Sequence, residues 1–164
     1  EMKSTGEVMG FGKTFGEAYF KAQRAAGVIL PKEGNVFISV RDHDKEPICE
    51  VASELVDMGF KIYATSGTSY YLADSGIACS KINKVKDGHP HIVDMIKNNE
   101  VHLIINTTEG ARSIKDSFSI RKEAQNHKIS LTTTVSGAKA FCKAIKFIDD
   151  FGAQDLKQRH RSIS

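Results

Sequence analysis

The sequence is poor in cysteine, and this scarcity limits the covalent and metal chemistry available to it. Cys49, Cys79 and Cys142 are the only cysteines among 164 residues. They are odd in number and far apart, so neither a disulfide framework nor a cysteine metal site is expected. Because unpaired cysteine is so often buried, we expect three structural thiols in a reducing, cytoplasmic compartment.

Long apolar runs and a strong charge of one sign are also missing. No window approaches the roughly 18 consecutive apolar residues that would cross a membrane. Residues 1–5 lack the apolar region of a secretory signal, and they do not look like an ordinary start, which predicts a piece of a longer chain. The net charge of +3 is only mildly basic, so we expect a mixed surface without a nucleic-acid partner.

From residue 36 onward, short apolar segments alternate with helical patterns. Strands are predicted at residues 36–40, 60–64, 77–82, 101–105 and 128–131, and helices at 45–58, 68–76, 90–98, 117–125 and 136–147. Such alternation implies right-handed crossovers and a three-layer α/β fold with a five-stranded parallel, Rossmann-like sheet. An additional helix is predicted at 14–26, a boundary near 30–34, and a lightly packed tail after about 148.

The chain is organised around residues 101–112. An apolar strand of the kind buried on both faces breaks abruptly into Asn106, Thr107 and Thr108, followed by Gly110 and Arg112. In an open parallel sheet, ligands bind beyond the carboxyl ends of the strands. The amide, hydroxyl and guanidinium groups of this segment should therefore face a ligand crevice.

The other predicted strands end in similar chemistry. Their following loops contain Ser39, Arg41 and Lys45; Thr65, Ser66, Gly67 and Thr68; Lys84 and Lys86; and Thr132 to Ser136. Hydroxyls, helix N-termini and cations together make a phosphate cradle, and the loop 65–68 is the best single candidate. Helix capping alone explains Ser and Thr in any one loop, but four such loops with cations at one edge favour a small anionic ligand.

Catalytic and metal motifs are not evident. The sequence has no GxGxxG or GxxxxGK[ST] phosphate loop and no His-x-x-x-His spacing. His43, His89 and His91 lie in or near the loops, with Asp42 and Asp44, but no two form a recognisable catalytic dyad. We expect surface or capping roles for them and no metal site.

Several segments together resemble one known family. They are Ser39-Val40-Arg41 with Asp44-Lys45-Glu46, Ala64-Thr65-Ser66-Gly67-Thr68, Asn83-Lys84-Val85, Gly88-His89-Pro90-His91-Ile92, Ile105-Asn106-Thr107-Thr108, Asp116-Ser117 and Ile120-Arg121. The sequence resembles the methylglyoxal-synthase-like allosteric domain at the carboxyl end of the large subunit of bacterial carbamoyl-phosphate synthase. Residues 1–30 resemble the end of the preceding ATP-grasp unit, so 31–164 would form the allosteric domain.

The resemblance implies a regulatory role. The parent ligase makes carbamoyl phosphate from bicarbonate, ammonia and ATP, with Mg or Mn and K, for pyrimidine and arginine synthesis. The rest of the large subunit and the glutaminase small subunit would be partners, and the parent would form a homo-oligomer. This piece has neither ATP-grasp site, so it should need no cofactor and catalyse nothing alone.

In the family, UMP inhibits and IMP activates through one overlapping site at the sheet edge. The matching positions are Ser39, Lys45, Thr65, Thr68, Lys84, Asn106, Thr107, Thr108 and Arg112. The resemblance implies that the two lysines, with Thr65 and Thr68, hold the phosphate, and that Asn106 and Thr108 contact ribose or base. Ala111 stands where the family often has a second arginine, which predicts weaker affinity.

Ornithine, an activator in the family, binds where this domain meets the synthetase. The corresponding region here is Leu131, Thr132 and Thr133. The well-studied pattern is Tyr-Asp-Thr-Thr, and this chain has Leu-Thr-Thr-Thr, so a phenol and a carboxylate are missing. Ornithine activation is therefore left open.

Two other functions, an enzyme and a structural module, match parts of the sequence. Methylglyoxal synthase, acting on dihydroxyacetone phosphate, shares the fold but carries its catalytic Asp in a Gly-Gly-Asp-Gln-Gln segment. Residues 85–90 lack that motif, and Asp87 is only roughly in its place, whereas an acid–base group must lie within hydrogen-bond reach. A purely structural oligomerisation module would leave the polar sheet edge unexplained.

Overall fold

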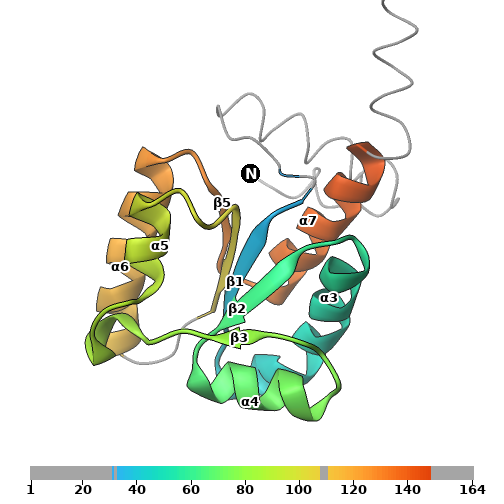
Figure 1. Ribbon diagram of the computed structural model, residues 1–164, viewed down its shortest axis with the longest axis horizontal. Helices are drawn as coiled ribbons and strands as arrows, with labels where there is room; N and C mark the ends of the chain where they lie inside the picture. Colours follow the sequence, from blue (N-terminus) through green and yellow to red (C-terminus); the bar gives the residue numbers. More distant parts are fainter. Residues whose placement is uncertain (1–30, 32, 108–110, 149–164) are drawn as a thin grey trace, which may run out of the picture.

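The chain forms a parallel sheet with helices on both faces, as Figure 1 shows. The computed structural model describes residues 31, 33–107 and 111–148, without the side chains of 86 and 111–116. The predicted helix at 14–26, the domain boundary near 30 and the tail after 148 lie outside these residues or are not tested by them.

All five strands are parallel, in the order β3-β2-β1-β4-β5. They are β1 (Asn35–Ser39), β2 (Lys61–Ala64), β3 (Ser80–Lys81), β4 (Leu103–Asn106) and β5 (Ser130–Thr132). The helices between them are α3 (Lys45–Asp57), α4 (Ser66–Asp74), α5 (Ile92–Lys97), α6 (Ala111–Asn126) and α7 (Val135–Phe147), with single 3-10 turns at Asp42–Asp44 and Val85–Asp87. The predicted fold class is confirmed.

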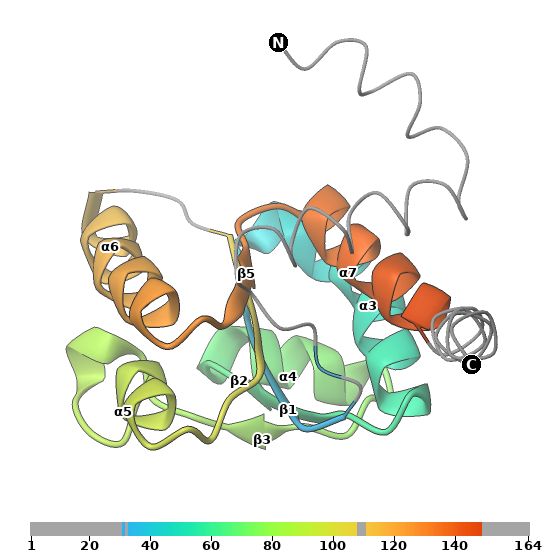
Figure 2. The same cartoon turned by 90° about the horizontal axis from the view of Figure 1, so that it is seen from above.

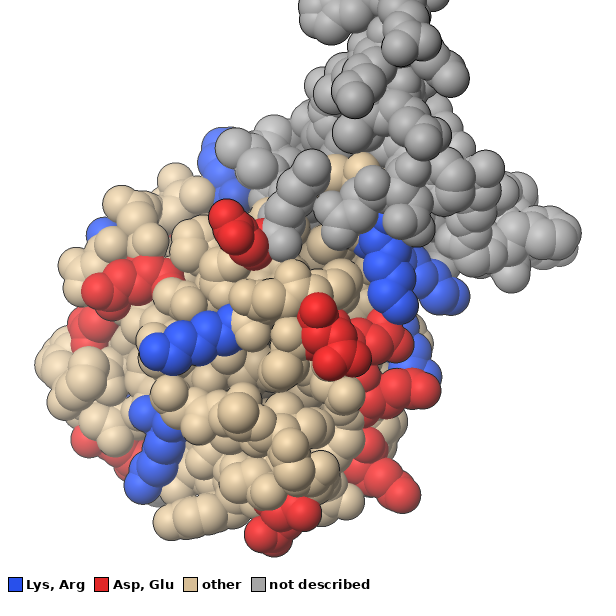
Figure 3. Space-filling view, turned by 45° about the vertical axis from the view of Figure 1, so that its right-hand side comes forward, with Lys and Arg blue, Asp and Glu red and all other residues tan. Residues whose placement is uncertain are grey.

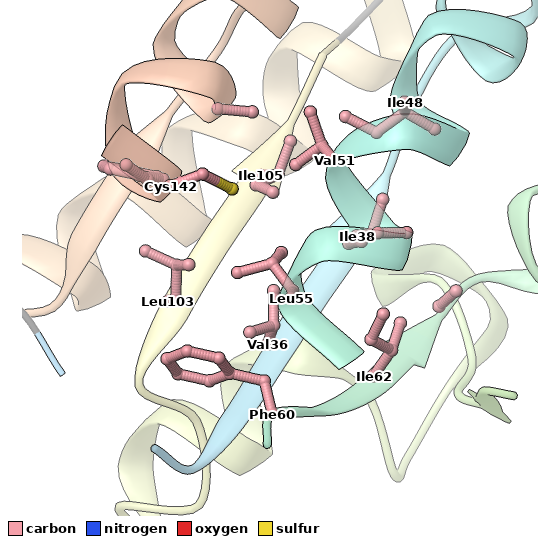
Figure 4. Close-up of a cluster of buried hydrophobic side chains, with 14 of the residues drawn as sticks. Val36, Ile38, Ile48, Val51, Leu55, Phe60, Ile62, Leu103, Ile105 and Cys142 are labelled. Carbon is pink, nitrogen blue, oxygen red and sulfur yellow. The ribbon is translucent and has the colours of Figure 1, made fainter. Parts of the chain in front are cut away.

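Alternate residues of the central strands enter two separate cores. Val36 and Ile38 of β1 pack with Leu103 and Ile105 of β4 against helices α3, α4 and α7. Figure 4 shows this side, with Cys142 of α7 and the apolar stripe of α3 lying over the two strands. The strand period of two explains the division, because neighbouring side chains point to opposite faces.

The second core lies on the other face, under α5 and α6. Phe37 of β1 and Ile104 of β4 pack there with Ile92 and Ile96 of α5 and Ile120 of α6. Figure 2 shows the two helix layers from above, with the sheet between them. Both faces of β1 and β4 are thus covered, which explains their nearly continuous apolar sequences.

Three boundaries differ from the sequence expectation. Helix α6 begins at Ala111, six residues before the predicted start. Helix α5 begins at Ile92, because His91 is its N-cap and the Asp94 carboxylate accepts the His91 backbone N–H. Pro90, expected at the first helical position, precedes the helix. Strand β3 has only two residues, since it lies at the edge and pairs with β2 alone.

The cysteines are unpaired thiols, as expected. Cys49 and Cys79 are half-buried and Cys142 is buried. Burial raises the pKa of the Cys142 thiol to about 12, to which the nearby Glu54 carboxylate adds. Over the described residues, none of the helices combines the length and apolarity that a membrane span requires.

Candidate functional site

The carboxyl ends of β1, β2 and β4 bring the predicted polar residues to one edge. Ser39 is level with Asn106 across the β1–β4 pair, and Ile38 is level with Ala64, the residue before Thr65. The Thr107 backbone N–H donates to the Ser39 carbonyl at 3.0 Å. Three loops that are distant in sequence therefore start from one place.

Thr65 occupies a capping position without making a capping hydrogen bond. It is the N-cap residue of α4, but its side chain accepts nothing from the helix. Its hydroxyl instead lies 3.0 Å from the Ser39 hydroxyl. The first N–H groups of a helix have no partner within the helix, so this N-terminus keeps its positive end toward the sheet edge.

Helix α7 provides the contrast within the same fold. The Thr134 hydroxyl accepts the backbone N–H of Gly137 at 2.9 Å, which is an ordinary side-chain cap. Capping therefore explains the hydroxyl at the start of α7 but not the one at the start of α4. Helix capping therefore accounts for Thr134 in the loop before α7. It does not account for Thr65 in the loop 65–68, which is the best phosphate candidate.

Other predicted hydroxyl and amide groups fix the loops to one another. The Thr68 hydroxyl accepts the Val40 N–H at 3.2 Å, and the Thr107 hydroxyl accepts the Arg41 N–H at 3.0 Å. The Asn106 amide donates to the Ser117 hydroxyl at 2.8 Å. Thr68, Asn106 and Thr107 are all buried. They shape the floor of the edge and hold α4 and α6 in place.

Lys45 supplies a cation at the α4 N-terminus. Its ammonium lies close to Gly67 in the first turn of α4, so that a β-carbon built on Gly67 would be 3.2 Å from Nζ. The same ammonium is 2.7 Å from a carboxylate oxygen of Asp42, whose side chain is almost fully exposed. An incoming phosphate oxygen can replace this exposed carboxylate as the partner of Lys45.

Lys84 belongs to the same electrostatic neighbourhood. A hydrogen bond and the charge of Lys45 lower the pKa of Asp42, and His43 and Lys84 lower it further. Both lysines therefore act on one carboxylate at the sheet edge. Lys84 is exposed, immediately before the 3-10 turn Val85–Asp87.

Some predicted residues are not brought together or not described. Arg41 pairs with Asp44, with Nε 2.9 Å from the carboxylate, and so makes a local ion pair. Thr108 and the side chain of Arg112 lie outside the described residues. On the face drawn in Figure 3, acidic and basic side chains are interspersed, without one extended basic patch.

Comparison with known proteins identifies the family of the chain. The MGS-like domain family matches residues 47–133, more than half of the sequence. The chain belongs to this family. It is 52% identical over 163 residues to the carbamoyl phosphate synthase large chains of Pseudomonas syringae and Pseudomonas aeruginosa, and 47% identical over 164 residues to that of Ralstonia nicotianae. These alignments cover 99% of this chain but only 15% of each relative.

In this MGS-like domain, the region expected for ornithine is occupied by local interactions. Leu131 is half-buried, Thr132 is buried and Thr133 is exposed. The Thr132 hydroxyl donates to the Thr134 carbonyl at 3.3 Å and lies 3.4 Å from the Thr134 N–H. It also lies so close to Gly137 that a β-carbon there would be 1.8 Å from it.

The MGS-like domain also contains a cluster of potential metal ligands that the sequence reasoning missed. His89, His91 and Asp94 place one ligand atom each within 4.8 Å of one another. A search for His-x-x-x-His spacing overlooks them, whereas His-x-His with Asp three residues later would have found them. Asp87, the acid considered for synthase chemistry, is exposed in the 3-10 turn.

Proposed function

We propose that this MGS-like domain binds a nucleotide monophosphate at the carboxyl edge of its sheet. The phosphate would sit on the first turn of α4, between Lys45 and Lys84. The observation that carries the proposal is the open α4 N-terminus, where Thr65 leaves the helix uncapped and Lys45 lies beside Gly67. Backbone N–H groups, a helix dipole and a cation are the usual components of a phosphate site.

The remaining residues of the edge would orient the rest of the ligand. The Ser39 and Thr65 hydroxyls share a partly buried hydrogen bond, and either hydroxyl would turn to a phosphate oxygen. Asn106 and Thr107 form a buried floor, and they would meet the ribose or base together with Thr108. Arg112, at the start of α6, would add a third cation near the nucleotide.

We further propose that the domain regulates a carbamoyl phosphate synthase large subunit. UMP would act as inhibitor and IMP as activator, and together they would control the supply of carbamoyl phosphate for pyrimidine and arginine synthesis. ATP, Mg or Mn, and K would be bound by the remaining part of that enzyme, which would also contact the glutaminase subunit. Support comes from the identity to large chains, of which this chain spans 15%.

Regulation would proceed by coupling between distant sites. A nucleotide changes activity only if it binds two states of the enzyme with different affinity. The Thr68 and Thr107 hydroxyls connect the site to the backbone after β1, so a ligand that tightens this edge would also fix α4 and α6. Ornithine, if it acts here, would do so near residues 131–133.

A thermal-shift titration tests the nucleotide site. A ligand at 100 times its dissociation constant adds about 2.7 kcal/mol of stability, which raises the melting temperature by roughly 2–4 °C per kcal/mol in a protein of this size. We expect a rise with UMP or IMP that is lost in Lys84→Ala and kept in Lys122→Ala, which removes an exposed lysine of α6. Equal shifts in both variants, or none with either nucleotide, would refute the proposal. Ornithine and inorganic phosphate, titrated in parallel, report on the other effector and on the phosphate alone.

A further inference from the structure

Three side chains between β3 and the second turn of α5 form a compact cluster. His89 Nδ1 is 2.7 Å from Asp94 Oδ2, and His91 Nδ1 is 3.7 Å from the same oxygen. The two imidazole rings lie with their centroids 4.5 Å apart and tilted by 30°. No residue of the cluster belongs to the phosphate site described above.

His91 has an unusual polar environment. The residue is only 7% exposed, and its Nδ1 has no hydrogen-bond partner among the described residues. A buried polar atom without a partner costs free energy and calls for a physical explanation. Its Nδ1 lies 3.7 Å from Asp94 Oδ2, and its ring lies beside that of His89, so a cation bound among the three residues would satisfy it.

Asp94 is already held in position for binding. Its Oδ2 accepts the backbone N–H of His91 at 2.9 Å. This bond and the one from the His89 ring keep the pKa of Asp94 below its usual value, the latter being the larger cause. The carboxylate is thus ionised, oriented by the backbone and has further lone pairs to offer.

We propose that His89, His91 and Asp94 form a binding site for a divalent transition-metal ion, with zinc as the preferred ion. Two imidazoles and one carboxylate are a ligand set typical of zinc sites with an open fourth position. Ligands at about 2.0–2.1 Å in a tetrahedron lie roughly 3.3 Å apart, between the two ring-to-carboxylate distances in the cluster. A small rotation of the exposed His89 ring would bring the three ligand atoms to this spacing.

The surroundings leave room for solvent at the fourth position. An open surface hollow of about 460 Å³ adjoins the cluster, lined by His89, Pro90, Asp94, Lys97 and Asn98. Water can enter it and complete the coordination. Lys97 is the opposing feature, since its positive charge lowers the affinity for a cation.

The site is tested by titrating the chelator-treated chain with Zn²⁺ in a calorimeter and with Co²⁺ in a spectrophotometer. We expect one ion per chain, and visible absorption bands of four-coordinate Co²⁺. Removing a ligand should weaken binding by more than the roughly 10–100-fold seen for residues that merely support a ligand. His89→Ala is the decisive variant, because the His89 side chain is 76% exposed and its loss should leave the fold intact.

The matched control is His127→Ala. His127 also faces a carboxylate, with Nε2 3.8 Å from Glu123, but it lies outside the cluster. Affinity that falls in His89→Ala and persists in His127→Ala supports the site. Unchanged affinity and Co²⁺ spectrum in His89→Ala, or the absence of one-to-one binding in the unsubstituted chain, would overturn it.

Discussion

At the scale of single residues, Thr65 stands at a helix-cap position, but its side chain does not cap the helix. Its place after a strand and before Ser66-Gly67-Thr68 predicts a helix cap, and the residue is indeed the N-cap of α4. Its hydroxyl nevertheless turns to Ser39, 26 residues away. Sequence spacing predicts the cap position, but only the parallel pairing of β1 with β2 brings the second hydroxyl close.

Gly137 is required by a contact that sequence analysis does not reveal. A β-carbon at this position would lie 1.8 Å from the Thr132 hydroxyl and 2.9 Å from its β-carbon. Thr132 is buried and cannot swing away, so Gly137→Ala should destabilise the protein by about 1–3 kcal/mol, measured by urea unfolding. Gly67→Ala is the control, because there the nearest atom is the flexible end of Lys45. Equal stability of the two variants would contradict the contact.

Cys142 should be chemically inert in the folded protein. Its pKa of about 12 against a reference of 9.0 lowers the thiolate fraction roughly 10³-fold at neutral pH. Mass spectrometry after iodoacetamide treatment should find it modified only in denaturant. Since the folded pKa is raised, the corresponding stability is complete below pH 9 and declines above it as the unfolded thiol ionises. Rapid alkylation under native conditions would contradict this burial.

At the scale of elements, the central strands and their helices are the most predictable part. Strands β1 and β4 are short, nearly continuous apolar runs, and the apolar residues of α3 and α7 recur every three to four positions. The structure confirms these elements within a few residues. The predicted start of α5 at Pro90 is wrong. A proline is a common first helical residue, but here His91 is the N-cap and the Asp94 carboxylate accepts its backbone N–H.

The hydrogen bonds that Asp94 accepts from the His89 ring and the His91 backbone N–H make the start of α5 sensitive to acid. The pKa of Asp94 is lowered in the folded state, so its stabilisation is present above the unfolded value of about 3.9 and is lost as the pH falls through the folded value. Asp94→Asn should therefore flatten the loss of stability with acid, measured as the urea midpoint between about pH 6 and 3. Asp74→Asn, at the exposed end of α4, should keep the slope of the unsubstituted chain. A slope unchanged by Asp94→Asn would refute the role of this carboxylate.

At the scale of the whole molecule, the site is a product of topology. Strand order β3-β2-β1-β4-β5 places Ser39, Thr65 and Asn106 together because their strands are neighbours. A parallel sheet could be predicted from the alternation of elements, and with it the edge that gathers the polar loops. Hydrogen bonds such as Asn106 to Ser117 could not, since they depend on how α6 packs.

The two cores predict unequal effects of two phenylalanines. Phe37 is 1% exposed on the α5–α6 face of β1, and Phe118 of α6 is 67% exposed. Phe37→Ala should cost about 3–5 kcal/mol of unfolding free energy, and Phe118→Ala should change it by no more than about 0.5 kcal/mol. Denaturant unfolding followed by circular dichroism measures both. Similar costs would mean that α6 is packed differently or that Phe118 is covered.

Nucleotide binding at the carboxyl edge is most directly tested by an amide NMR titration with UMP. We predict shifts for Gly67 and Thr68 in the first turn of α4 and for Lys84, Asn106 and Thr107, all at that edge. The amide signals of Gly59, which precedes β2, and Gly76, which follows α4, should not shift, because both residues lie at the opposite edge. Saturating shifts centred on Gly59 and Gly76, or no shifts at the α4 N-terminus, would contradict the proposed nucleotide site.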